Sequence, residues 1–190
     1  MLSRMSIFDS LKKTAENVVS GFKKEQKTET FTFAALPESV DEMKALPDGA
    51  LDTPFKTAAL SICALCAYAA APEIGTQMLD FLKGPQPLSP LNKQFLRDRF
   101  MDGSTYVPFS YFEGAVPGND YTPTEPFKVT FFTNPYSFDN EGYVKLFVRS
   151  GGADSERYLV LRQKGEQWFL WEYEGLLSGI RKPKSQDPWA

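Results

Sequence analysis

The sequence predicts an α+β protein in which an N-terminal amphipathic helix and a small helical region precede a C-terminal antiparallel β-meander of about four strands. Apolar residues recur at three- and four-residue steps before Gly103 and alternate with polar residues after it, and these are the periods of helices and strands. Turn-forming residues separate the alternating segments from one another. Because helices followed by strands are typical of α+β domains, we expect residues 30–190 to form one such domain.

Residues 1–29 are predicted to form an amphipathic helix and a linker. The helix has an apolar stripe on one face and charged residues on the other, and residues 1–30 hold six basic and four acidic side chains. Three roles are open for it: docking on its own domain, contact with a protein partner or a second copy, and attachment to an anionic membrane. The membrane is the least favoured, because acidic residues interrupt the basic face. The stripe residues expected to make the contact are Phe8, Leu11, Val18, Val19 and Phe22.

Four helices are expected between residues 37 and 101. The second, from Pro54 to about Ala71, is apolar on nearly all sides, so we expect it to lie at the centre of the domain. Pro54 suits the first position of a helix, where a missing N–H costs no hydrogen bond. Cys63 and Cys66 lie in the middle of this helix and are interpreted as core residues rather than as a redox or zinc motif. The four predicted helices span residues 37–46, 54–71, 73–83 and 90–101.

Four strands rich in aromatic and β-branched residues are expected after the helices. Lys164 and Gly165 form a tight hairpin turn between the last two. The basic side chains near this turn, Arg157, Arg162 and Lys164, are interpreted as a solvated face of the strands. The basic, proline-containing tail at 181–190 is expected to lie along the surface. The four predicted strands span residues 127–133, 143–149, 158–163 and 167–173.

The composition excludes several classes of function. The chain has no histidine, so neither a histidine-dependent nucleophile nor a histidine-ligated metal site can form. We expect no metal site and no cofactor, which favours a protein that is not an enzyme. The net charge of −3 argues against nucleic acid as a partner. Two cysteines and the lack of a signal-peptide pattern predict a cytoplasmic protein.

The most unusual segment is residues 106–138, which hold ten aromatic residues and five prolines. Aromatic side chains offer large, rigid contact areas and are enriched in protein interfaces. We therefore expect a non-enzymatic binding or assembly module that binds a protein partner, or a second copy of itself, through this segment. The alternative is that these rings lie inside the fold, where they close the end of the sheet or cover the helices. The residues predicted to bind the partner are Tyr106, Phe109, Tyr111, Phe112 and Tyr121.

Two other functions are open. A pocket between the helices and the sheet, lined by Trp168, Trp171 and aromatic neighbours, would make this a small-molecule-binding protein or an enzyme that works without histidine. Such an enzyme could take a carboxylate pair from Glu113, Asp120 and Glu125, although carboxylates in loops are usually solvated. The other alternative is a peripheral membrane protein attached through its N-terminal helix.

Five stretches of the chain resemble a family of bacterial proteins described only as a domain of unknown function. They are residues 30–39, 51–58, 81–89, 95–100 and 167–171. The resemblance covers residues from about 30 to 189 and implies a bacterial, intracellular protein with a single domain. It implies no activity, cofactor or site residue.

Overall fold

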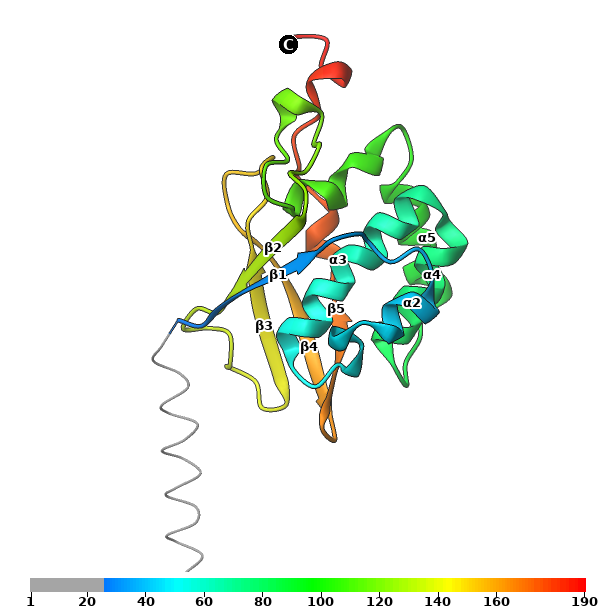
Figure 1. Ribbon diagram of the computed structural model, residues 1–190, viewed down its shortest axis with the longest axis vertical. Coiled ribbons are helices and arrows are strands. Elements are labelled where there is room, and N and C mark those ends of the chain that lie inside the picture. The colour runs from blue at the N-terminus through cyan, green and yellow to red at the C-terminus, as the bar shows by residue number, and fades with distance from the viewer. Residues whose placement is uncertain (1–25) are drawn as a thin grey trace, which may run out of the picture.

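The computed structural model describes residues 26–190 and shows a five-stranded antiparallel sheet with helices packed on one of its faces (Figure 1). The strands follow one another across the sheet in chain order. The α+β class predicted from the change of hydrophobic period is therefore confirmed. The strands span Thr28–Phe33 (β1), Phe127–Phe132 (β2), Tyr143–Val148 (β3), Arg157–Lys164 (β4) and Gln167–Glu172 (β5).

The four predicted helices are present, and in three of them a side chain caps the N-terminal end. The hydroxyl groups of Ser39, Thr53 and Ser89 each accept a hydrogen bond from a backbone N–H in the first turn, which satisfies a donor that has no partner within the helix. Each of these three residues directly precedes the first residue of its helix. The helices span Val40–Ala45 (α2), Pro54–Ala70 (α3), Pro72–Lys83 (α4) and Pro90–Arg99 (α5).

Helix α3 lies at the centre of the domain, as its uniformly apolar sequence predicts. It packs across the inner face of the sheet and contacts all five strands. Helix α4 packs against α3, and at Gly75 the two backbones are so close that an added Cβ would lie 2.2 Å from the Cα atom of Tyr68. Glycine is therefore required at this crossing, and α4 is held firmly beside the edge strand β5.

The sheet has five strands rather than about four, because residues assigned to the linker and the start of the domain form β1. Thr28 lies opposite Phe132, and Phe33 lies opposite Phe127. The hydroxyl groups of Thr30 and Thr130 are 2.7 Å apart on this pair. The sequence has no hairpin turn next to β1 that would indicate a strand. The reason is that its partner, β2, follows all of the helices in the chain. The N-terminal helix predicted before it lies outside the described residues.

Strands β2 and β3 diverge after a short paired region, and a loop fills the gap between them. The backbone N–H of Glu113 donates to the carbonyl of Lys128 on β2, at 2.9 Å. The N–H of Gly151, just after β3, donates to the carbonyl of Ser110, also at 2.9 Å. The loop thus occupies the place of a strand at this end of the sheet. The register between β2 and β3 joins only Phe131 to Val148 and Phe132 to Phe147.

Candidate functional site

The five aromatic residues predicted to bind a partner do not form an exposed surface. Tyr111, Phe112 and Tyr121 are buried, and Tyr106 and Phe109 are half-buried against the hydrophobic core. The physical reason is the gap between β2 and β3, which large rings fill and seal against water. The expected aromatic surface is therefore corrected: these rings close the end of the sheet.

The tyrosines of this segment also hold the C-terminal part of the chain, and we call Tyr106, Tyr111 and Tyr121 the tyrosine cluster. The rings of Tyr106 and Tyr121 are stacked, with centroids 5.1 Å apart. Burial raises the pKa of all three hydroxyl groups, that of Tyr121 to about 12. Because each hydroxyl group has a partner inside the fold, the cluster has a structural role. The hydroxyl groups of Tyr106, Tyr111 and Tyr121 donate to the backbone carbonyls of Ile180, Leu176 and Arg181, respectively.

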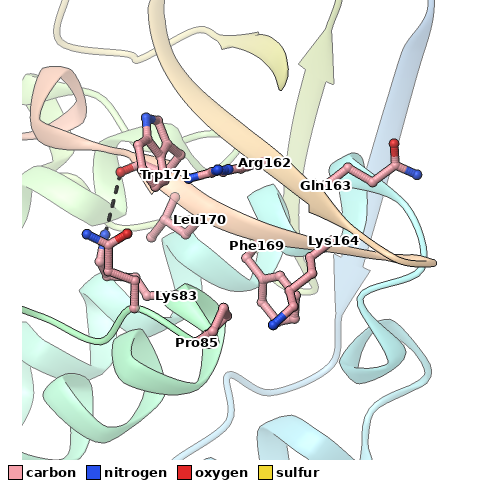
Figure 2. A pocket seen from close by; sticks show the side chains of 9 residues that line it. Lys83, Pro85, Arg162, Gln163, Lys164, Phe169, Leu170 and Trp171 are labelled. Atoms are coloured by element: carbon pink, nitrogen blue, oxygen red, sulfur yellow. Dashed lines mark hydrogen bonds between the residues drawn. The ribbon is translucent and has the colours of Figure 1, made fainter. Parts of the chain in front are cut away.

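A pocket of about 360 Å³ lies beside the edge strand β5, where the end of α4 meets β4 and β5 (Figure 2). Helix α4 ends at Gly84, whose φ of +61° is rarely adopted by other residues. An added Cβ there would lie 2.3 Å from the ring of Phe169, so glycine lets the loop approach β5. We call this site the cationic pocket. Its lining residues are Lys83, Pro85, Gln86, Arg162, Gln163, Lys164, Phe169, Leu170 and Trp171.

Three of the lining side chains are cations: Lys83, Arg162 and Lys164. The guanidinium group of Arg162 lies 4.6 Å from the centroid of the Trp171 ring, and Figure 2 shows these two side chains next to each other. None of the lining residues is acidic. Within residues 26–190, the ion pairs join other side chains: Lys27 to Glu29, Lys56 to Asp52 and Arg181 to Asp154. The pocket therefore holds positive charge that the described part of the fold does not neutralise by ion pairing.

Lys83 is the most enclosed of the three cations. Its ammonium group lies 3.5 Å from the carbonyl oxygen of Trp171, the contact drawn in Figure 2. Desolvation by burial lowers the pKa of Lys83, while the nearby charges of Glu174 and Asp80 act in the opposite direction. An ammonium group has three donors, and one long hydrogen bond leaves donors available for a ligand.

Sequence reasoning identified part of this pocket. Trp171 lines it as predicted, but Trp168 does not, and its side chain packs against the hydrophobic core instead. Lys83 and Phe169 were missed. The sequence gives no signal that the C-terminal end of α4 lies against β5.

The three basic residues of β4 do not share one role, contrary to the prediction of a single solvated face. Arg157 uses its guanidinium group for hydrogen bonds to the backbone at the surface of the fold. It donates to the carbonyls of Ser155, Ser178 and Gly179 at 2.9 to 3.1 Å. Arg162 and Lys164 are exposed, but they line the cationic pocket.

The remaining candidate residues provide no second site. Glu113, Asp120 and Glu125 are all exposed. Cys63 and Cys66 are buried in α3, as predicted, and burial raises the pKa of both thiols. Across the part of the chain that the structure describes, no group of three or more Cys, Asp and Glu side chains is arranged to hold a metal ion. No helix among residues 26–190 combines the length and apolar composition needed to cross a membrane.

The structure thus defines an α+β domain with one layer of helices on an antiparallel sheet and a cationic pocket at the sheet edge. The chain belongs to the family described as Domain of unknown function (DUF6935), whose sequence profile matches residues 35–184. The family resemblance noted in the sequence is therefore confirmed, and the bacterial origin stays a prediction. No curated protein and no solved structure matches the chain.

Proposed function

We propose that this protein is a binding module for a small anionic ligand, whose carboxylate or phosphate group is held in the cationic pocket. One observation carries the proposal: Lys83, Arg162 and Lys164 line one pocket, and within residues 26–190 none of them is ion-paired. Lys83 is half-buried, and removing a charge from water without a partner costs free energy. A ligand that supplies the negative charge would complete this arrangement.

The walls of the cationic pocket support a ligand that also carries a flat or apolar group. Phe169 and Trp171 provide aromatic surface, and Gln86 and Gln163 provide amide groups for hydrogen bonds. A volume of about 360 Å³ lies within the range of small-molecule sites. We therefore propose an aromatic or similarly flat carboxylate or phosphate as the ligand class.

Isothermal titration calorimetry on the full chain tests this proposal with benzoate, phenyl phosphate, inorganic phosphate and phenol as probes. We expect at least one of the two aromatic anions to bind, more tightly than inorganic phosphate. Phenol, which has the ring but no charge at neutral pH, should not bind measurably. The comparison of benzoate with phenyl phosphate separates a carboxylate site from a phosphate site. Absence of binding by both aromatic anions would contradict the proposal.

Variants of the lysines locate the binding site. Lys83→Met and Lys164→Met should each weaken binding of the preferred anion by about tenfold, since a charge-assisted hydrogen bond is lost. Lys182→Met, in the exposed tail, removes the same charge elsewhere and should leave the affinity unchanged. Equal weakening by all three variants would indicate a general effect of net charge and not a site.

Binding should also depend on pH through Lys83. The ligand requires the charged ammonium group, and burial lowers the pKa of Lys83. Affinity is therefore expected to fall as pH rises through that lowered pKa, before ordinary lysines lose their protons. Lys83→Met should remove this part of the pH dependence.

A further inference from the structure

The face of the sheet opposite the helices carries a row of aromatic rings. Phe132, Phe147 and Tyr158 are neighbours on β2, β3 and β4, with ring centroids 6.0 and 6.2 Å apart. They alternate along their strands with buried residues that face α3, so they project from the other side of the sheet. In Figure 1 the labelled helices all lie on one side, so within the described residues they leave this face uncovered.

Two cations lie on these rings. The ammonium group of Lys145 is 4.6 Å from the centroid of Tyr158, and the guanidinium group of Arg149 is 5.6 Å from that of Phe132. Neither cation takes part in the ion pairs found within residues 26–190. Tyr158 is 40% exposed, so part of its ring is open to a partner. We call these five residues (Phe132, Lys145, Phe147, Arg149 and Tyr158) the outer aromatic face.

A hollow of about 520 Å³ adjoins the outer aromatic face at Phe132. Lys128 and Arg149 contribute positive charge to its lining, against the single carboxylate of Glu113. Val116, which is 44% exposed, and Phe132 contribute apolar surface. The hollow therefore offers a seat for one side chain of a partner, next to basic groups that can bind carboxylates.

We propose that the outer aromatic face binds an acidic polypeptide segment of another protein. Its carboxylates would contact Lys128, Lys145 and Arg149, and its apolar side chains would cover the rings and enter the hollow. Arginine and aromatic residues are the side chains that contribute most to protein interfaces, and complementary charge selects the partner. This surface is separate from the cationic pocket in its residues and in its ligand.

The occupied ring faces argue against one other occupant of this face, and charge argues against another. Single-stranded nucleic acid binds by stacking bases on open ring faces, whereas here Lys145 and Arg149 lie over the rings of Tyr158 and Phe132. The chain's own residues 1–25 hold five basic and three acidic side chains, so they do not complement a basic surface. A partner rich in Asp and Glu complements Lys128 and Arg149 at one end of this face, whereas Lys145 shares a hollow with Asp139, Glu141 and Glu172.

Fluorescence anisotropy on the full chain tests the proposal with three labelled probes. They are a short peptide of glutamates interspersed with leucine, the same peptide with glutamine in place of glutamate, and a thymidine oligonucleotide. We expect the acidic peptide to bind, with an affinity that falls as salt concentration rises, and the glutamine peptide not to bind. Stronger binding of the oligonucleotide than of the acidic peptide would overturn the proposal, as would the absence of peptide binding.

Charge-reversal variants decide where the peptide binds. Lys145→Glu and Arg149→Glu should each weaken it by at least about tenfold, while Lys93→Glu, an equal change of charge at an exposed site on α5, should have little effect. Far-UV circular dichroism and thermal unfolding confirm that the variants fold. Loss of peptide binding on Lys83→Met or Lys164→Met, but not on Lys145→Glu, would place the peptide in the cationic pocket and overturn the proposal. Because Lys145→Glu leaves the cationic pocket intact, each proposal can fail alone.

Discussion

The tyrosine cluster and the cationic pocket both contain side chains that end in polar groups. The two regions differ in whether those groups have partners within the fold. In the tyrosine cluster, every hydroxyl group donates to a backbone carbonyl of residues 176–181. In the cationic pocket, Arg162 and Lys164 make no ion pair within residues 26–190, and Lys83 has one long contact to a carbonyl. The comparison teaches that satisfied polar groups stabilise the fold, whereas unsatisfied ones beside a cavity are available to a ligand.

Strand β4 shows the same contrast with two residues of one type. Arg157 donates to three backbone carbonyls and so joins β4 to the C-terminal part of the chain. Arg162, farther along the strand, lies over the rings of Tyr143 and Trp171. The first arginine is therefore expected to matter for stability and the second for binding.

The largest effect is expected at alkaline pH, because several buried hydroxyl groups act together. Burial raises the pKa of Tyr111, Tyr121 and Tyr173 in the folded protein, that of Tyr121 to about 12, whereas tyrosine in an unfolded chain titrates near 10. Their contribution to stability is thus fully present below about pH 10 and is lost as pH rises toward 12 and beyond. Urea unfolding at a series of pH values measures this loss, and a Tyr121→Phe variant should reduce it. A free energy of unfolding that stays constant through this range would contradict the burial of the tyrosine cluster.

A glycine next to the tyrosine cluster offers the next largest effect. A Cβ on Gly152 would lie 2.0 Å from the hydroxyl oxygen of Tyr121 and 2.8 Å from a methyl carbon of Ile180. We expect Gly152→Ala to lower the free energy of unfolding by about 2 to 3 kcal/mol through overpacking. Gly118→Ala is the matched control, because an added Cβ there meets nothing within 4 Å. Similar urea midpoints for the two variants would show that the tyrosine cluster tolerates displacement.

Two tyrosines allow the value of a satisfied hydroxyl group to be measured directly. Tyr111 donates to the carbonyl of Leu176, so Tyr111→Phe should cost about 1 to 2 kcal/mol by leaving that carbonyl without its partner. The hydroxyl group of Tyr173 is buried and has no hydrogen-bond partner among the described residues. Tyr173→Phe is therefore expected to leave stability unchanged or to raise it slightly. Thermal unfolding of both variants provides the comparison, and a larger loss from Tyr173→Phe would reverse its interpretation.

The smallest effect on stability is expected in the cationic pocket. Lys83→Met should change the free energy of unfolding by no more than about 0.5 kcal/mol, because the lysine makes no ion pair that the fold depends on. Arg157→Met should cost about 1 kcal/mol through its lost hydrogen bonds. Urea unfolding distinguishes the two variants. A large decrease in the free energy of unfolding on Lys83→Met would mean that this lysine stabilises the fold and is not reserved for a ligand.

The helices and four of the strands were predictable because their signals are local. Ser39, Thr53 and Ser89 mark helix starts through hydrogen bonds to residues only three positions away. The strands after Gly103 are indicated by the alternation of apolar and polar residues and by the turns between them. Strand β1 was not predicted, because its hydrogen-bonding partner, β2, comes after all of the helices in the sequence.

The candidate site was less predictable, because it is made by contacts between distant elements. The sequence suggested a pocket near Trp171, and the structure places one there. Lys83 joins it only because the Gly75 crossing and the glycine end of α4 bring that helix end to β5. The aromatic segment was misjudged for the same reason: a sequence shows that rings are abundant, but not that β2 and β3 leave a gap for them.

By itself, the sequence determined the α+β class, the central position of α3, the burial of Cys63 and Cys66, and the exclusion of histidine chemistry. These properties follow from composition and from the short repeats of apolar residues that are typical of helices and strands. Only the tertiary structure decided which aromatic residues are buried, which cations are paired, and where a pocket opens. Those properties depend on packing between elements far apart in the chain, and short-range patterns do not encode the distance between such elements.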